Sequence, residues 1–361
     1  MTCKILYIGK EIEKARTGSE ICNFNNQKIL KNIFSENYYM YSLPKETVMQ
    51  VFINKFFFMY PGLQIKIFKY IFKYIEETKP DFIFIETAQF GILSKKIKQK
   101  FSQCKIITFF HNIEIEYAKS YFSFKNPKSW YFYILTKINE SLSIKYSDYC
   151  LSINDNDSKK MNEIYYRKAD FVMSFSVENR LQEKDIENLS SKNKKIHAHE
   201  CLFVGTNFFG NTDGLFWFIK EVMPLCNIHL TIIGNGMTKA FTDSEKITVL
   251  DFVDDLKGFY IQTDFVLLPI ISGGGMKTKT AEAMMYGKAI IGTENAFLGY
   301  DIEKLHGIYL CKSKNDFIEA IDKIYRDEIF LFNKDIYERF KEKHSLSVTE
   351  EKCRGFFESI S

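Results

Sequence analysis

Short apolar segments alternate along this chain with longer stretches in which apolar residues recur at helical spacing. The alternation is typical of α/β proteins with parallel sheets, because a helix must return the chain before each new strand. In the first half, strands are expected at residues 4–9, 81–86, 105–111, 148–153 and 169–174. In the second half they are expected at residues 200–205, 228–234, 247–252, 264–269, 289–293 and 307–311.

The two series of strands predict two Rossmann-like, doubly wound domains. A chain of 361 residues is longer than one ordinary hydrophobic core supports. Residues 1–185 are expected to form the first domain and residues 200–342 the second, with the polar stretch 186–199 as a linker. Residues 343–361 have helical spacing and no strand, so we expect a last helix that returns to the first domain.

Composition predicts a soluble, cytoplasmic protein. Hydrophobic residues make up 46% and charged residues 26%, which is typical of globular proteins. The eight cysteines are scattered singly, as expected of buried thiols in a reducing compartment. The opening MTCKILYIG is expected to be a first strand and not a secretion signal, and no apolar run is long enough to span a bilayer.

The net charge of +4 is distributed unevenly. Residues 1–185 contain 28 Lys and Arg against 20 Asp and Glu, whereas the rest contains 21 against 25. A basic first half suits an anionic surface, phospholipid or polyanionic substrate, although solvated helix faces would explain the lysines equally well. The aromatic, lysine-containing stretch 52–74 favours a helix packed on the sheet over a membrane-surface helix, and membrane contact there is a secondary hypothesis.

The most informative segment is ISGGGMKTKTAEAMMYGKAIIGT, residues 271–293. It leads from a strand through three glycines into a helix, where free backbone N–H groups attract anions. Lys279 and Glu282 stand three apart and share a helix face, while Lys277 is expected on the preceding turn. The lysines would hold a diphosphate and Glu282 the hydroxyls of a ribose. An ordinary surface turn with an ion pair is the alternative.

This segment resembles the donor-binding motif of glycosyltransferase family 4, in the subgroup with the pattern G-[SG]-G-x-[RK]-x-K-x-x-E-A-x-x-x-G. Residues 202–226, TIIGNG and VLDFVDDLKGFYIQTDFVLLPI resemble other parts of the family's donor domain, and IITFFHNIEIEYAKS resembles its H-N-x-E element. The resemblance implies a glycosyltransferase B-type fold, in which two Rossmann-like domains face each other across a cleft. The second domain would hold the donor and the first the acceptor.

The resemblance also implies roles for individual residues. Lys277 and Lys279 match phosphate-binding cations, Glu282 matches a ribose ligand, and His111 matches a histidine that approaches the donor sugar. Further matches are the diphosphate loop Gly205, Thr206 and Asn207, the nucleobase segment Phe252 and Val253, the glycine turn Gly273, Gly274, Gly275 and Met276, and Gly18 as the remnant of a first-domain glycine loop.

Two departures from the family pattern are visible. Gly274 stands eight residues before Glu282, where the usual pattern has a first glutamate. Asn207 and Asn211 replace the usual Arg and Lys after the donor domain's first strand. More of the phosphate charge would then fall on the two lysines, and Asn211 is expected to cap the next helix.

Together these features predict a retaining, metal-independent glycosyltransferase of the hexosyltransferase type. No D-x-D pair for a metal is present, and no cofactor is expected beyond the nucleotide-diphosphate-sugar donor. The expected acceptor is a glycan or lipid-linked molecule in cell-surface polysaccharide biosynthesis, at the inner face of the membrane, with no nucleic-acid partner. Glu114 and Glu116 are weaker candidates for a general base.

Three other functions fit parts of the pattern. A nucleotide-sugar 2-epimerase would share the fold, but would need further acid and base residues. A catalytically silent, donor-binding partner of another transferase would explain Gly274 and the missing arginine. A dinucleotide oxidoreductase is disfavoured because G-x-G-x-x-G is absent after the first strand. The pair His197 and His199 lacks the further ligands of a metal site.

Overall fold

The computed structural model describes the chain apart from residues 14, 16, 45–62, 64, 192–199, 274 and 327–330. The chain divides into two compact units, one formed by Met1–Phe175 with Thr349–Ser361 and the other by Ser176–Val348. The division lies ten residues before the boundary expected at 185. Part of the expected linker is helical, since α8 spans Glu183–Ser191, and the remainder lies outside the described residues.

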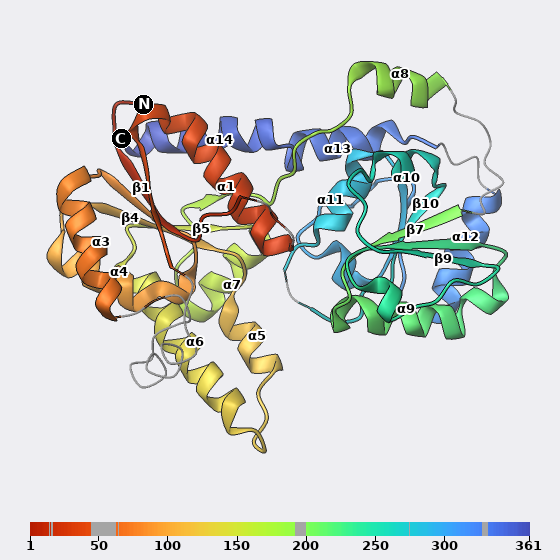
Figure 1. Ribbon diagram of the computed structural model, residues 1–361, viewed down its shortest axis with the longest axis horizontal. Helices are drawn as coiled ribbons and strands as arrows, with labels where there is room; N and C mark the ends of the chain where they lie inside the picture. The colour runs from red at the N-terminus through yellow and green to blue at the C-terminus, as the bar shows by residue number, and fades with distance from the viewer. Residues whose placement is uncertain are drawn as a thin grey trace. The chain divides into compact units, whose positions relative to one another are not determined.

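Within its described residues, the first unit has a six-stranded parallel sheet in the order β2-β1-β3-β4-β5-β6 (Figure 1). Its strands are β1 (Ile5–Gly9), β2 (Tyr38–Ser42), β3 (Phe82–Ile85), β4 (Lys105–Phe110), β5 (Tyr149–Ser152) and β6 (Phe171–Val172). Its helices are α1 (Gly18–Phe34), α3 (Ile65–Thr78), α4 (Gly91–Lys100), α5 (Glu114–Ser120), α6 (Pro127–Tyr146), α7 (Asp155–Tyr165) and most of α14 (Leu346–Ile360).

Side chains that alternate along each strand supply two separate cores. On one face, strand residues such as Leu6 and Ile83 pack with Ile71 of α3 and Leu93 of α4. The opposite face is aromatic. There Phe82 of β3 lies with its ring centroid 5.8 Å from that of Phe357. A sheet that is buried on both faces explains why the strands are continuous apolar runs.

The helix α3 agrees with the sheet-packing interpretation of residues 52–74, as far as that stretch is described. Ile67, Ile71 and Ile75 recur every four residues and are buried against the sheet. The lysines of α3 that the stretch contains, such as Lys66 and Lys69, are exposed on the other side. This is the ordinary amphipathic pattern of a helix that covers a sheet.

The last helix, α14, packs on the aromatic face of the first sheet. Phe357 is fully buried, and its ring lies edge-on to Phe34 of α1 at 5.0 Å. Nearby, Asn32 Nδ2 donates a hydrogen bond of 2.8 Å to Glu350 Oε2. Residues from Thr349 onward therefore complete the first core, whereas the returning segment was expected to begin at residue 343.

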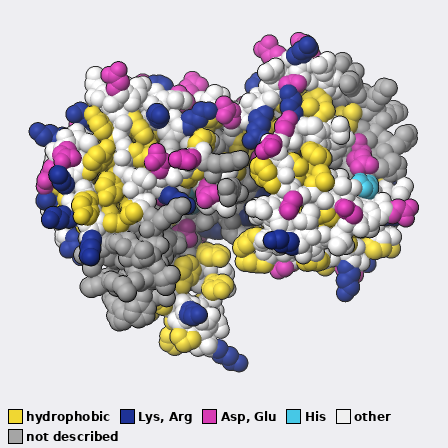
Figure 2. Space-filling view, in the orientation of Figure 1, with side chains coloured by type: hydrophobic (Ala, Val, Ile, Leu, Met, Phe, Trp, Pro, Cys, Tyr) yellow, Lys and Arg dark blue, Asp and Glu magenta, His cyan; other side chains and the backbone are white. Residues whose placement is uncertain are grey.

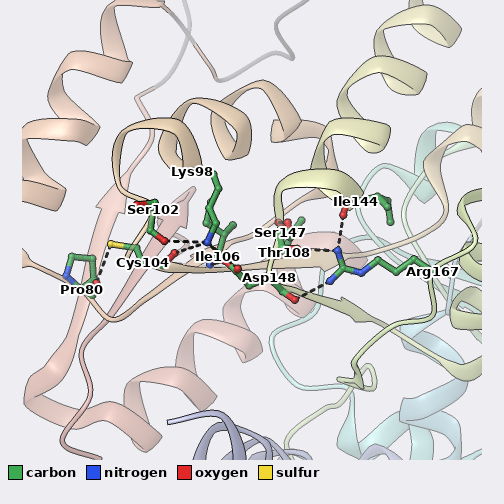
Figure 3. A network of polar contacts seen from close by, with 10 residues as sticks. All are labelled: Pro80, Lys98, Ser102, Cys104, Ile106, Thr108, Ile144, Ser147, Asp148 and Arg167. Atoms are coloured by element: carbon green, nitrogen blue, oxygen red, sulfur yellow. Dashed lines mark hydrogen bonds and ion pairs between the residues drawn. The ribbon is translucent and has the colours of Figure 1, made fainter.

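A polar network fixes the start of β4 and β5 (Figure 3). Asp148 accepts hydrogen bonds from Lys98 Nζ at 2.8 Å and from the backbone N–H of Ile106 at 2.7 Å. Arg167 donates to the carbonyl oxygens of Ser147 at 2.9 Å and Asp148 at 2.9 Å. Both cations are occupied by groups of the protein, so this network joins strands and helices and leaves little charge for a ligand.

The second unit repeats the architecture with the strand order β12-β11-β10-β7-β8-β9, all parallel among the described residues. Its strands are β7 (Glu200–Val204), β8 (His229–Ile233), β9 (Ile247–Leu250), β10 (Phe265–Leu268), β11 (Ala289–Gly292) and β12 (Ile308–Leu310). Its helices are α8, α9 (Phe209–Glu221), α10 (Lys257–Gln262), α11 (Thr278–Met285), α12 (Lys314–Arg326) and α13 (Lys334–His344).

The predicted fold class, two doubly wound parallel α/β units, is confirmed. All eleven expected strands are present, with ends shifted by at most two residues. One strand was missed. β2, with the sequence YYMYS, pairs with β1 at the edge of the first sheet and is only partly buried. Its aromatic residues do not alternate with polar ones, so the segment lacks the strand pattern.

Candidate functional site

The glycine turn between β10 and α11 lies open. Gly273 and Gly275 have φ angles of 105° and 72°, in the region that L side chains rarely adopt. A Cβ atom added to Gly273 would meet no atom of the chain within 4 Å. The turn therefore leaves room for a ligand beside its backbone. Gly274, the residue between them, lies outside the described residues.

Lys277 closes this turn and stands at the N-cap position of α11. Its amine donates hydrogen bonds to the carbonyl oxygens of Gly273 at 3.2 Å and Gly275 at 2.6 Å. Burial lowers the pKa of this amine to about 8. The side chain thus reaches back over the glycine turn and brings a positive charge to the start of the helix.

Lys279 is the second residue of α11 and is only 8% exposed. Its amine donates a 2.5 Å hydrogen bond to Asn211 Oδ1 and lies 4.4 Å from the centroid of the Phe203 ring. Burial, and then the nearby charge of Lys277, lower the pKa of Lys279 to about 7. Among the described residues no carboxylate forms an ion pair with this amine. A buried cation of this kind gains stability when an anion binds beside it.

The loop after β7 supplies the opposite side of the same site. A Cβ atom at Gly205 would lie 2.8 Å from Lys279 Nζ, so the backbone there contacts the amine directly. Asn211 Nδ2 donates to the carbonyl oxygen of Thr206 at 2.8 Å. The expectation that Asn211 caps α9 is wrong, because the helix begins at Phe209 and Asn211 instead holds the loop and Lys279 together.

Glu282 lies one turn beyond Lys279 on α11, with its carboxyl group in a different environment. Its Oε2 accepts a 3.3 Å hydrogen bond from the Tyr260 hydroxyl. Burial raises the pKa of Glu282, while the Arg180 guanidinium and the Tyr260 hydrogen bond oppose the rise. An acceptor next to a buried hydroxyl can receive hydrogen bonds from the hydroxyls of a ligand.

The remaining predicted residues of the second unit flank this site. Asn207 Nδ2 donates to Gly236 O at 3.0 Å, which joins the loops after β7 and β8. Phe252 and Val253 follow β9, and Phe252 is among the exposed large side chains. Met276, which follows the glycine turn, is partly buried. The second unit thus brings the two lysines, the glycine turn and Gly205 together.

The predicted residues of the first unit lie at the carboxyl ends of its strands. His111 follows β4 and is half-buried, with its ring edge-on to Phe109 at 4.8 Å. Burial lowers the pKa of His111 to about 4, so its ring is neutral at pH 7. Gly18 begins α1 next to Thr17, whose hydroxyl caps the helix by accepting from Glu20 N at 3.3 Å.

Three carboxyl groups of the first unit, those of Glu86, Glu114 and Glu140, also lie in low-polarity surroundings. Glu86 accepts hydrogen bonds from Tyr7 Oη at 3.0 Å and from Lys10 N at 2.9 Å, and burial raises its pKa to about 7. Burial likewise raises the pKa values of Glu114 and Glu140 to about 7. At pH 7 a large share of these groups is protonated, and each can then donate as well as accept a hydrogen bond.

No group of three or more His, Cys, Asp or Glu in the described residues could hold a metal ion. Among the described helices, none combines the length and the apolar character that a bilayer span requires.

The second unit is similar to a known family of proteins. Residues 198–327 match the family model of the glycosyl transferases group 1. The match covers less than half of the chain and shows a similarity of the second unit to this family. The matched region contains every residue of the lysine and glycine site. The family 4 subgroup to which the motif was compared stays a prediction.

Solved structures confirm the glycosyltransferase B-type fold over the whole chain. The galactosyltransferase WaaB of the lipopolysaccharide outer core is 14% identical, with a TM-score of 0.66 over 99% of this chain and 100% of that one. HepE of Anabaena, in complex with UDP and glucose, is 10% identical with a TM-score of 0.70 over the same shares. Sucrose-phosphate synthase of Thermosynechococcus elongatus is 10% identical with a TM-score of 0.72 over 99% of both chains. No curated protein sequence matches the chain.

Sequence reasoning missed the partners that position the predicted residues in the second unit. Asn211 was assigned to a helix cap, and neither Phe203 nor Tyr260 was considered. Asn211 lies 68 residues before Lys279, and Tyr260 lies 22 residues before Glu282. A parallel sheet brings the ends of distant strands to one edge, and no local pattern in the sequence marks which side chains meet there.

Proposed function

We propose that this chain is a retaining, metal-independent glycosyltransferase of the hexosyltransferase type. It transfers a sugar from a nucleotide-diphosphate-sugar to a glycan or lipid-linked acceptor in cell-surface polysaccharide biosynthesis, at the cytoplasmic face of the membrane. The second unit binds the donor, and the first unit binds the acceptor. No cofactor takes part.

The observation that carries this proposal is the buried amine of Lys279. Its hydrogen-bond partner is a neutral amide, and its pKa is lowered to about 7. A buried, poorly compensated cation beside an open glycine turn suits a ligand with two or more negative charges. A diphosphate fits this requirement, and Glu282 is close enough in sequence and on the helix face to bind the adjoining ribose.

The same amines account for catalysis. As the glycosidic bond breaks, negative charge grows on the departing diphosphate. Lys277 and Lys279 stabilise that charge, together with the backbone N–H groups at the start of α11. Groups that are held in place before the reaction and bind the transition state more strongly than the substrate raise the turnover number. His111, neutral at pH 7, contributes a hydrogen bond to the sugar and adds no charge.

HepE, with UDP and glucose bound, supports UDP-glucose as the first donor to test. The purified chain is incubated with UDP-glucose and other nucleotide-sugars, with and without a mixture of glycan and lipid-linked acceptors. Released nucleoside diphosphate and the anomeric configuration of the product are measured. We expect nucleoside diphosphate release that depends on the acceptor, and a product that keeps the donor's configuration. In Lys279→Met, both the release and the formation of this product should fall steeply.

Three results would contradict the proposal. Conversion of the donor to a 2-epimer without any acceptor would favour the epimerase. Donor binding without hydrolysis or transfer in any mixture would favour the catalytically silent partner. Activity that disappears when divalent cations are chelated would contradict metal independence.

A further inference from the structure

Helices α5 and α6 form a hairpin that projects away from the sheet of the first unit (Figure 1). The part farthest along this hairpin, residues 117–137, is here called the aromatic tip. Its large exposed side chains include Phe124, which is 82% exposed, and Trp130, which is 43% exposed, together with Tyr117, Tyr121 and Ile134. Large apolar side chains that are exposed together in one place often mark a surface that binds a partner.

The aromatic tip is an ordered structure. The buried Ser129 hydroxyl donates to Asn126 O at 2.7 Å and accepts from Ser123 N at 3.0 Å. Asn126 caps α6, and Trp130 Nε1 donates to Ser123 O at 3.0 Å. The turn between the helices is thus fixed by hydrogen bonds. Its outward aromatic side chains are held in place before any partner arrives, which reduces the entropy lost on binding.

The aromatic side chains support one another. The Phe122 ring stacks on Trp130 with 5.9 Å between centroids, and Phe124 lies edge-on to both, at 5.2 Å from Phe122 and 6.0 Å from Trp130. These contacts leave the outer face of Phe124 exposed. The result is an exposed apolar surface at the end of the hairpin.

The charge of the aromatic tip has one sign. Residues 117–137 contain four lysines, at 119, 125, 128 and 137, and no aspartate or glutamate. All four lysines are exposed. Lys119 pairs with Glu116 at 2.7 Å, whereas among the described residues no carboxylate forms an ion pair with the other three. Figure 2 shows hydrophobic and basic side chains together on this projection.

We propose that the aromatic tip docks on an anionic phospholipid bilayer. Aromatic rings at the end of a projection suit the boundary between headgroups and acyl chains, and lysines around them suit lipid phosphates. A raised surface of one charge complements a flat surface of the opposite charge. The proposal does not depend on the proposed enzymatic activity. It is separate from the membrane contact considered for the stretch 52–74, of which residues 52–62 and 64 lie outside the described residues.

Co-sedimentation of the full chain with vesicles tests the proposal. Vesicles of phosphatidylcholine and phosphatidylglycerol in a 3:1 ratio are compared with vesicles of phosphatidylcholine alone. We expect binding to the anionic vesicles that weakens as salt is added. The double variant Tyr121→Ser and Phe124→Ser removes two exposed rings and is expected to weaken binding about tenfold or more.

A second pair of changes separates charge from apolar contact. Lys125→Gln with Lys128→Gln is expected to weaken binding to anionic vesicles about tenfold at low salt. The control for both tip variants is Lys69→Gln with Tyr70→Ser on α3, which removes one exposed lysine and one exposed ring at another place on the first unit. This control is expected to bind as the unchanged chain does.

Trp130 provides a direct readout. The chain has two tryptophans, so Trp217→Phe leaves Trp130 as the single fluorophore. Anionic vesicles should shift its emission to shorter wavelength and protect it from acrylamide. Failure of the chain to bind these vesicles, unchanged binding by both tip variants, or equal loss in the α3 control would overturn the proposal. Self-association without lipid that the Tyr121 and Phe124 changes abolish would also overturn it, because the tip would then join copies of the chain.

Discussion

The carboxyl ends of the two sheets carry groups of opposite kind, although both sheets have six parallel strands. At the first, burial raises the pKa values of Glu86 and Glu114 to about 7. At the second, burial lowers the pKa values of Lys277 and Lys279 to about 8 and 7. The carboxyl groups at the first edge and the amines at the second are therefore only partly charged at pH 7. A bound anion would favour the charged form only of the amines. In the proposed function, the first edge therefore meets neutral hydroxyl groups of the acceptor and the second holds the diphosphate.

A lowered lysine pKa does not by itself mark a binding site. Lys288, in the same unit, is fully buried, and burial lowers its pKa to about 8. Its amine donates to the carbonyl oxygens of Thr263 at 2.8 Å and Ile261 at 3.3 Å. Lys279 differs because its amine lies against Gly205, beside a turn with open space. The contrast between these two lysines makes the strongest test.

The largest expected effect is that of Lys279→Met. It removes the amine and keeps most of the side-chain volume, so turnover should fall by roughly 10²-fold or more, since the departing diphosphate loses its main counter-charge. Initial rates of nucleoside diphosphate release measure this. Lys288→Met is the matched control. It should cost about 1–3 kcal/mol of unfolding free energy by leaving two carbonyls unpaired, with turnover of the folded protein unchanged. Equal losses of turnover in both variants would contradict the assignment.

A smaller effect is expected at the edge of the first sheet. His111→Ala should lower turnover about tenfold through the loss of a neutral hydrogen bond to the sugar. The dissociation constant for UDP should not change, because the first unit does not hold the nucleotide in the proposed function. Steady-state rates and calorimetric titration separate the two effects. A weaker affinity for UDP without a loss of turnover would reverse the roles given to the two edges.

The smallest effect is expected for Glu282→Gln, which keeps the size of the side chain and its contact with Tyr260. A neutral amide is a weaker acceptor than a carboxylate, so the affinity for UDP should fall about fivefold to tenfold. Titration with UDP and with its 2′,3′-dideoxy analogue measures this. The variant should bind the two ligands almost equally, and a full tenfold preference for UDP would argue against ribose binding at this carboxylate.

The local parts of the site could be predicted from the sequence, but their partners could not. The glycines, Lys277 and Lys279 lie within seven residues, and their positions follow from a strand, a turn and a helix. The contact of Lys279 with Asn211 joins two loops that only the sheet brings together. The burial of individual side chains could not be predicted either. Glu86 reads as an ordinary carboxylate at the end of a strand, and its raised pKa depends on side chains packed from several elements.

The elements of the fold could likewise be predicted only where local sequence determines them. Strands that are buried on both faces could be predicted, because their sequences are continuous apolar runs. The strand β2 was missed, and the break between the units lies at Phe175, inside a stretch of strand and loop residues with no polar bias. Polar composition at 186–199 indicated a linker, yet α8 continues to Ser191. Domain boundaries depend on contacts between distant residues, which composition does not record.

The measurement that tests the central claim most directly is calorimetric titration of UDP between pH 6.5 and 9.5, in buffers of different ionisation enthalpy. In the free protein Lys279 and Lys277 lose their protons at pH values of about 7 and 8, and bound diphosphate should hold those protons. Above these values binding must take up protons, so affinity should fall as the pH rises, and Lys279→Met should abolish most of the dependence. An affinity for UDP that stays constant over this range, with no proton uptake and no change in Lys279→Met, would contradict the account.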